Sequence, residues 1–336
     1  MKKFKKHFLP LESNGAYLFF IFIMIAALIV SIAVSIVLGS VDIKFGDVIG
    51  FLANKISGRR VVVPTWDDSI ESIIWDIRTP RVLTAFIVGA GLTLCGIVMQ
   101  ALTKNTLADP YVLGISQGAS SGAVFMIMYG SMFFYGQYGT VLGAFIGAVI
   151  SIVIALQIAK IRNKVTATQL ILAGIAVAAM FGALTNIMIY LQRTGSDKVK
   201  TAQYWMMGSL SGSTWERLVY VAIVFVVCFI VIYAIRKMLD AMLLGDDVAL
   251  TLGVNTGRLK LIMILVTTLL TGAIVSISGV IGFVGLTIPH ITRSVVGSKH
   301  TRLIPAATLV GGTFLVLADV ISRVIISPEE LPIGVV

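Results

Sequence analysis

The sequence predicts an all-α polytopic membrane protein with about ten transmembrane helices, from its composition, its apolar runs and its lack of long polar stretches. Of the 336 residues, 57% are apolar and 12% are charged, whereas soluble domains are about 45–50% apolar and about 25% charged. The apolar residues form runs of the ~20 residues that a helix needs to cross a bilayer. No polar stretch approaches the ~100 residues of a typical soluble domain. We therefore expect residues 1–336 to form a single transmembrane domain.

The first apolar run, residues 17–38, predicts a membrane span rather than a signal peptide. It is 22 residues long, whereas the apolar core of a signal peptide has roughly 7–15 residues. Basic residues beside a span mark the cytoplasmic side. We expect a cytosolic N-terminus, because the run follows Lys2, Lys3, Lys5 and Lys6.

Nine further spans are expected along the chain. They are residues 82–102, 111–130, 139–159, 168–191, 215–235, 259–277, 279–297 and 303–326, and a tenth that begins near residue 331. The 279–297 span contains Gly282, Gly285 and Pro289, which predict a short, kinked helix. The tenth is expected to be truncated in this chain, since six residues of helix rise only ~9 Å. In the polar segment after the first span, residues 42–52 have the apolar spacing of an interfacial helix.

The residues needed for catalysis or for metal and nucleotide binding are scarce. No Gly-Lys pair is present for a Walker A loop, and the three histidines are far apart in sequence. Cys95 and Cys228 both fall in apolar stretches, which favours buried thiols over a disulfide or metal site. We expect no catalytic residue, no metal site and no cofactor. The net charge of +10 lacks the aromatic-interleaved basic patch of a nucleic-acid binder, so no nucleic-acid partner is expected.

Few ionisable groups fall within the predicted spans. Asp319 is the main candidate for an ionisable group on a transport pathway. The favoured interpretation is that it pairs with Arg323, four residues later on the same helix. Ion-coupled carriers usually place acids or histidines along their pathway. The chain is therefore expected to need an energised partner.

A weak internal similarity leaves an inverted repeat open. Gly89-Ala90 precedes Gly96 by the spacing at which Gly272-Ala273 precedes Gly279, and Pro110 and Pro289 follow in the two halves. The two segments would enter the membrane from opposite sides, as in many transporters with inverted repeats.

A set of strings in a fixed order resembles one family of transporters. The strings are Arg78-Thr-Pro-Arg81-Val-Leu, Gly96-x3-Gln100-x4-Asn105-Thr-Leu-Ala-Asp-Pro110, Tyr204-Trp-Met-Met-Gly208-Ser, Leu244-Gly245-Asp-Asp247, Gly282-Phe-Val-Gly-Leu-Thr-Ile-Pro-His290 and Glu330-Leu-Pro-Ile-Gly334-Val-Val. Over about residues 70–336 they resemble FecCD-type permeases of ABC importers for iron-siderophores, haem and cobalamin. Thr106 departs from the family, which usually has Pro there.

The resemblance implies a permease in the cell membrane with several partners. These are a second permease subunit, identical or different, around a central pathway, a cytosolic ABC ATPase dimer, an extracytoplasmic substrate-binding lipoprotein and the surrounding membrane lipid. Translocation rather than catalysis would be its activity, because ATP is hydrolysed by the partner. The cargo implied is an iron(III)-siderophore complex, with haem or cobalamin as the alternative. A secondary carrier with inverted repeats and a membrane protein without transport activity are the competing classes.

The resemblance also assigns site residues. Arg78, Arg81 and Arg323 match positions that receive acidic side chains of the binding protein; snorkelling to the interface is the alternative. A cytosolic coupling region that contacts the ATPase is matched by Gly245, Asp246, Asp247, Val248, Leu252, Gly253 and Val254. Residues 243–254 are expected to form a short amphipathic helix bounded by glycines; a solvated connector is the alternative. Thr166, Ala167 and Thr168 resemble the cytoplasmic gate, where an ordinary turn is equally expected.

Overall fold

The structure, a computed structural model, describes residues 11, 13–39, 41, 43–58, 61–64, 66–130, 137–160, 166–192 and 196–336. These residues form helices and connecting turns, with no strand among them, as the sequence predicts. The long helices are α1 (Asn14–Val37), α4 (Thr79–Thr103), α6 (Gln137–Ala159), α7 (Ala167–Tyr190), α9 (Trp215–Ala234), α12 (Thr256–Ser278) and α14 (His300–Val324). The short ones are α2 (Phe45–Ser57), α3 (Asp68–Ser72), α5 (Ile115–Tyr129), α8 (Asp197–Met206), α10 (Arg236–Leu243), α11 (Asp246–Thr251) and α13 (Val284–Val296).

Seven helices in the described part of the chain are long and apolar enough to cross a membrane, fewer than the ten expected. The expected span at 111–130 divides into a 3₁₀ turn (Pro110–Leu113) and α5, whose 15 residues rise about 22 Å. The expected span at 279–297 contains only the 13 residues of α13, about 20 Å of helix. Residues 325–336 form turns rather than the start of a tenth helix. Helices α5 and α13 are therefore each shorter than the ~30 Å thickness of a hydrocarbon core.

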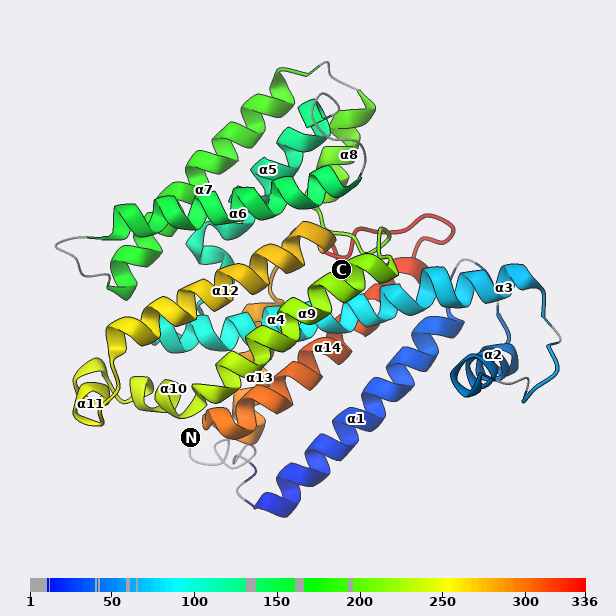
Figure 1. The fold of residues 1–336 in the computed structure, drawn as a ribbon, viewed down its shortest axis with the longest axis horizontal. Coiled ribbons are helices and arrows are strands. Elements are labelled where there is room, and N and C mark those ends of the chain that lie inside the picture. The colour runs from blue at the N-terminus through cyan, green and yellow to red at the C-terminus, as the bar shows by residue number, and fades with distance from the viewer. Residues whose placement is uncertain are drawn as a thin grey trace, which may run out of the picture.

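Helix α4 is the centre of the bundle. It packs against α9, α12, α13 and α14, and Figure 1 shows it running through the middle of the molecule. Two glycines allow the closest of these contacts. A Cβ atom at Gly96 would overlap the backbone carbonyl of Gly285, and one at Gly89 would overlap the carbonyl of Gly311. Small residues therefore set the helix spacing, as in other membrane bundles.

The two short helices α5 and α13 each begin inside the bundle. Gly114, just before α5, lies so close to α7 that a Cβ there would be 2.9 Å from the Gly174 carbonyl oxygen. Gly285, in the first turn of α13, packs against α4. The connections that precede them meet, since the Tyr111 hydroxyl donates to the Ile281 carbonyl oxygen at 2.9 Å and accepts from the Ile281 amide at 3.3 Å. After each of the helices α4 and α12, the polypeptide therefore turns back into the protein.

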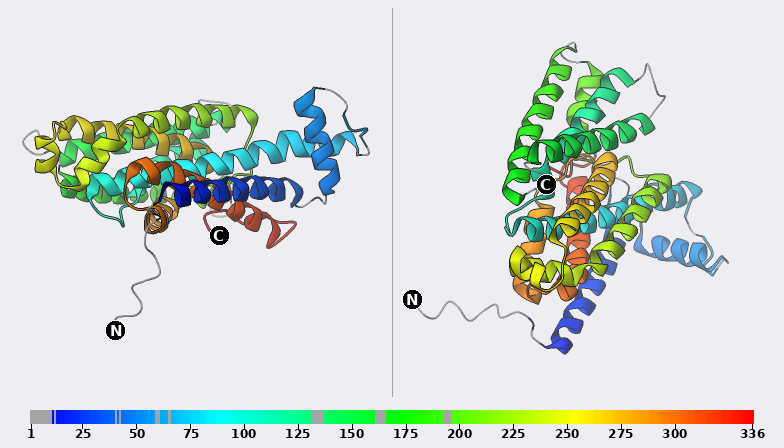
Figure 2. Two further views of the ribbon diagram at one scale, coloured as in Figure 1. Left: turned by 90° about the horizontal axis from the view of Figure 1, so that it is seen from below. Right: turned by 60° about the vertical axis from the view of Figure 1, so that its left-hand side comes forward.

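The bundle has two distinct ends along its long axis, which Figure 1 shows horizontally. One end carries α10 and α11 and is called here the α11 end. The other carries α2 and α3 and is called the α2 end. Figure 2 shows α2 lying across the axis of α4. The helix predicted around residues 42–52 is confirmed as α2, with Val48 and Phe51 buried and Phe45 exposed.

The two cysteines are buried and free, as expected. Cys95 is on α4 and Cys228 is on α9. Neither forms a disulfide, and among the described residues no group of three or more His, Cys, Asp or Glu side chains is arranged to hold a metal ion.

The α4–α13 contact can be tested with Gly96→Ala. The added methyl group meets backbone rather than a movable side chain, so we expect a loss of about 1–3 kcal/mol in stability and a lower thermal midpoint in detergent. Gly15→Ala is the matched control, because a Cβ at Gly15 in α1 meets nothing within 4 Å. Equal midpoints for the two variants would contradict the proposed close contact.

Candidate functional site

The structure brings Arg78, Arg81 and Arg323 together at the α2 end. Arg78 ends the π-helical turn before α4, Arg81 lies in the first turn of α4, and Arg323 lies in the last turn of α14. Asp319 binds two of them, with Oδ1 3.0 Å from Arg81 Nε and Oδ2 3.1 Å from Arg323 Nε. Both carboxylate oxygens of Glu330 lie 2.9 Å from Arg81 Nη1. Arg81 and Arg323 thus pair with the two carboxylates. With Arg78 the cluster holds three guanidinium groups and two carboxylates, which leaves an excess of one positive charge.

Two of these arginines also cap the end of α1. Arg78 Nη1 donates to the carbonyl oxygens of Ile36 and Val37 at 2.6 and 2.7 Å. Arg323 Nη1 donates to the Leu38 carbonyl at 2.9 Å. The last carbonyl groups of a helix have no partner within the helix and carry the negative end of its dipole. The arginines therefore hold α1 against α4 and α14.

The arginine cluster is buried. Arg78, Arg81 and Arg323 are 4%, 7% and 5% exposed. A pocket of about 270 Å³ is lined by Gly39, Val41, Ile73, Ile77, Arg78, Arg81, Arg323 and Glu330. The guanidinium groups are directed inward to carbonyls and carboxylates, so the structure does not show the snorkelling that was the alternative interpretation.

The predicted pairing of Asp319 with Arg323 is confirmed. The second partner of Asp319, Arg81, was not predicted, because 238 positions separate the two residues. Glu330 was part of a family string only, and nothing in its sequence neighbourhood indicated Arg81 as its partner.

The proposed coupling residues form a short helix at the α11 end. Gly245 (φ 122°) and Gly253 (φ 81°) have positive φ angles and bound α11, which spans only Asp246–Thr251. This is shorter than the helix expected over residues 243–254, because the Gly245 conformation separates α10 from α11. The apolar side chains of Val248, Leu250 and Leu252 are 42%, 54% and 62% exposed, whereas Val254 is half-buried.

Asp246 fixes the start of α11 to two core helices. Its carboxylate lies 2.7 Å from Lys104 Nζ, at the end of α4, and 2.6 Å from Lys260 Nζ on α12. Hydrogen bonds from Lys104 and Lys260 lower the pKa of Asp246. The contribution of this carboxylate to stability is thus complete above the ordinary aspartate pKa of ~3.9 and is lost as the pH falls through the lowered value. Near neutral pH Asp246 is charged.

A second contact holds α10 to the bundle. The Asp240 carboxylate accepts from the His300 backbone amide at 3.0 Å and lies 2.6 Å from His300 Nδ1, at the start of α14. His300 is fully buried. Nothing in the sequence indicates this pairing, because 60 positions separate the two residues. The α10–α11 segment is therefore attached to α4, α12 and α14 through charged side chains.

The proposed gate residues lie at the start of α7. Thr166 is the N-cap: its hydroxyl accepts from the Gln169 amide, and the Gln169 side chain accepts from the Thr166 amide. This reciprocal capping box stabilises a helix start. Ala167 and Thr168 form the first turn of α7, which Figure 1 shows at the same end of the bundle as α11.

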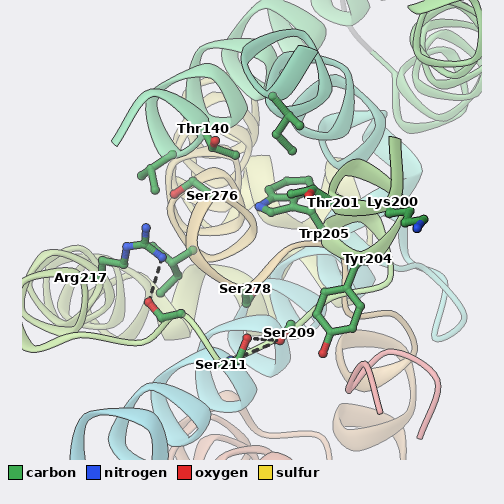
Figure 3. A pocket seen from close by; sticks show the side chains of 14 residues that line it. Thr140, Lys200, Thr201, Tyr204, Trp205, Ser209, Ser211, Arg217, Ser276 and Ser278 are labelled. Atoms are coloured by element: carbon green, nitrogen blue, oxygen red, sulfur yellow. Dashed lines mark hydrogen bonds between the residues drawn. The ribbon is translucent and has the colours of Figure 1, made fainter. Parts of the chain in front are cut away.

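Two pockets open beside α8, and both have linings that mix apolar and polar side chains. The first, about 520 Å³, lies between α8, α9 and α12 and contains several hydroxyl groups. In Figure 3 the Ser209 and Ser211 hydroxyls are bonded to each other, and Arg217 donates to the Gly212 carbonyl at 2.8 Å. The second, about 530 Å³, is lined by Gln117, Ser120, Ala178, Ala179, Gly182, Thr185, Asn186, Met206 and Val280.

The sequence matches the FecCD transport family over residues 27–336. It is 35% identical to the hemin transport system permease protein HmuU of Yersinia pestis, over 80% of this chain and 81% of that protein. It is 34% identical to the Fe(3+)-citrate import system permease protein YfmD of Bacillus subtilis, over 81% of this chain and 79% of that protein. A solved structure described as an inward-facing metal-chelate type ABC transporter is also similar, with a TM-score of 0.80 and 29% identity over 94% of this chain and 93% of that one.

The role of Asp246 in holding α11 can be tested with Asp246→Ala. Its ion pairs are about a third exposed, so we expect a loss of only about 0.5–1 kcal/mol, seen as roughly two- to fivefold faster amide hydrogen exchange in α11. Asp247→Ala is the matched control, because both acids lie in the first turn of α11 and Asp247 has no ion pair among the described residues. Equal exchange in the two variants would show that Asp246 does not position α11.

Proposed function

The chain belongs to the FecCD transport family and is an ABC importer permease of the membrane, and we propose that its cargo is an iron(III)-siderophore complex. ATP hydrolysis by a separate subunit drives its passage across the cytoplasmic membrane. The observation that carries this proposal is the family match, together with relatives for iron(III)-citrate and hemin. The described residues contain no cluster of metal ligands, which suits a metal ion that is already coordinated.

In this proposal the α2 end is extracytoplasmic and the α11 end is cytosolic. The orientation rests on the lysines before α1, which keep the N-terminus in the cytosol by the positive-inside rule. The cytosolic ATPase dimer docks on α11, where exposed Val248, Leu250 and Leu252 supply an apolar contact surface. Exposed apolar side chains grouped in this way are typical of protein interfaces. A second permease subunit, identical or different, completes the pathway.

The extracytoplasmic substrate-binding lipoprotein docks at the arginine cluster. Its acidic side chains enter the pocket lined by Arg78, Arg81 and Arg323. Guanidinium groups form bidentate pairs with carboxylates, and the excess positive charge of the cluster attracts them. Docking then favours one of two states of the pathway, and the ATPase shifts the same equilibrium from the other end.

The cytoplasmic gate of this proposal is the start of α7. The capping box stabilises the start of α7, where Thr166, Ala167 and Thr168 lie. A helix start that is stabilised locally can move as a unit when α11 moves. The pathway beyond it is lined by uncharged side chains such as Gln117 and Asn186 of the second pocket.

We also propose that the two halves of the chain form an inverted repeat. The packing is reciprocal: α4 contacts α13 and α14, while α12 contacts α5 and α6. Both α5 and α13 begin inside the protein, after connections that meet at Tyr111 and Ile281. In such a repeat α5 and α13 each count as one span, which raises the number among the described residues from seven to nine.

Haem is the second candidate cargo. It is favoured by the 35% identity to HmuU, which is as high as the 34% identity to YfmD. Cobalamin is a third member of the same class. Discrimination among them belongs to the binding protein, because the residues that line the second pocket are all uncharged and offer no strong ligand for one cargo over another.

The proposed function predicts ATP-dependent uptake in vesicles. The chain is reconstituted with candidate ABC ATPases and substrate-binding proteins from the same organism, and ⁵⁵Fe-labelled ferric siderophore is added with haem or cobalamin as competitor. We expect uptake that stops when a Walker B Glu→Gln ATPase replaces the active one. Uptake that continued without hydrolysis would instead support a secondary carrier, and transport of haem alone would correct the cargo.

The docking role predicts that Arg78→Glu with Arg323→Glu abolishes binding of the same binding protein. Two introduced carboxylates reverse the charge of the cluster, so we expect a loss of at least ~30-fold in affinity, since truncating buried charge pairs costs ~2–5 kcal/mol. Retained ATPase binding at the opposite end is the control for folding. Unchanged co-purification of the binding protein with a folded variant would refute docking at this site.

A further inference from the structure

Glu330 occupies the position on Arg81 that a partner's carboxylate would need. Both of its oxygens lie 2.9 Å from Arg81 Nη1, and Asp319 holds Nε of the same side chain. A bidentate end-on pair uses Nη1 and Nη2 together. An incoming carboxylate can form such a pair with Arg81 only if Glu330 gives up Nη1.

Exposure shows which member of the cluster a partner would meet first. The Glu330 side chain is 32% exposed, whereas that of Arg81 is 9% exposed and that of Asp319 is fully buried. Asp319 also binds Arg323, so it is held from two sides. Glu330 is thus the carboxylate of the cluster that is both accessible and held by a single arginine.

The residues that follow Glu330 connect it to the pockets. Residues 331–334, here called the strut, leave α14 with the Leu331 amide donating to the Ser322 carbonyl at 3.0 Å. At its far end the Ile333 amide donates to the Gly208 carbonyl at 3.0 Å, and the Gly334 amide donates to the Met207 carbonyl at 3.1 Å. The strut therefore joins the arginine cluster to the end of α8.

Helix α8 borders both pockets at the α2 end. Tyr204 and Trp205 line the first pocket and Met206 lines the second. Figure 3 shows Tyr204 and Trp205 on the wall of the first pocket, close to Ser209. A displacement of the strut would reach these residues through the Met207 and Gly208 carbonyls.

We propose that Glu330 is an internal competitor for Arg81, and that docking of an acidic partner displaces it and releases the strut from the end of α8. The inference rests on the proposed docking of a binding protein at the arginine cluster. The exchange of one carboxylate for another keeps the charge of the cluster constant while it frees Glu330 to solvent. Docking would thereby be communicated to the pockets without any change in the buried Asp319 pairs.

The test compares Glu330→Gln with Glu329→Gln in the complete transporter in nanodiscs. Both substitutions remove one negative charge from adjacent positions, so their effects on long-range attraction match, but Glu329 has no side-chain ion pair among the described residues. The dissociation constant is measured for the binding protein that supports vesicle uptake. We expect Glu330→Gln to bind on the order of tenfold more tightly than Glu329→Gln, mainly through slower dissociation.

The alternative role of Glu330, as a support that positions Arg81, predicts the opposite sign. Equal or weaker binding by Glu330→Gln than by Glu329→Gln would overturn the proposal and leave docking at the cluster intact. Normal binding by the Arg78→Glu, Arg323→Glu variant would instead refute docking itself. The two failures are therefore distinguishable.

Communication through the strut has its own measurement. In the transporter without binding protein, we expect Glu330→Gln to speed amide hydrogen exchange in peptides that cover residues 331–336, because the Ile333 and Gly334 amides lose protection. Glu329→Gln should exchange like the unaltered chain. Unchanged exchange in Glu330→Gln would overturn the part of the proposal in which the pairing of Glu330 with Arg81 keeps the strut bound to the end of α8.

Discussion

Every buried backbone group in a bilayer must find its hydrogen-bond partner within the protein, and this constraint organises the whole bundle. It limits irregular backbone to places that other helices cover. The connections before α5 and α13 satisfy it by meeting each other, with the Tyr111 hydroxyl serving both the amide and the carbonyl of Ile281. Glycines on α4 and α13 bring the surrounding helices close enough to enclose these segments.

The arginine cluster follows from the same constraint at the α2 end. The last carbonyl groups of α1 have no partner in their own helix, and Arg78 and Arg323 supply donors to them. Buried guanidinium groups in turn need counter-charges, which Asp319 and Glu330 provide. A site that holds three helices together is thereby also a site with a surplus positive charge, and the same residues can serve stability and partner binding.

The two ends of the bundle are built differently. At the α11 end, exposed apolar side chains stand on a short helix that is attached to the core by Asp246 and, one helix earlier, by Asp240. At the α2 end the charged groups are buried and the strut connects them to α8. These ion pairs and hydrogen bonds connect the α10–α11 segment to α4, α12 and α14. Two of those helices, α4 and α14, carry Arg81, Asp319 and Arg323 of the arginine cluster at the other end of the bundle.

The sequence by itself determined the membrane-spanning helical class, the positions of the long helices and the pairing of Asp319 with Arg323, because these depend on apolar run length and on spacing within one helix. It also indicated the glycines that bound α11. It could not show that the segments at 111–130 and 279–297 are only partly helical, since an apolar stretch that turns back into the protein has the composition of a span. The pairings of Arg81 with Asp319 and Glu330, of Asp246 with Lys104, and of His300 with Asp240 join residues far apart in the chain. Only the tertiary structure decides such contacts, because a guanidinium or carboxylate in a sequence carries no sign of which distant partner will neutralise it.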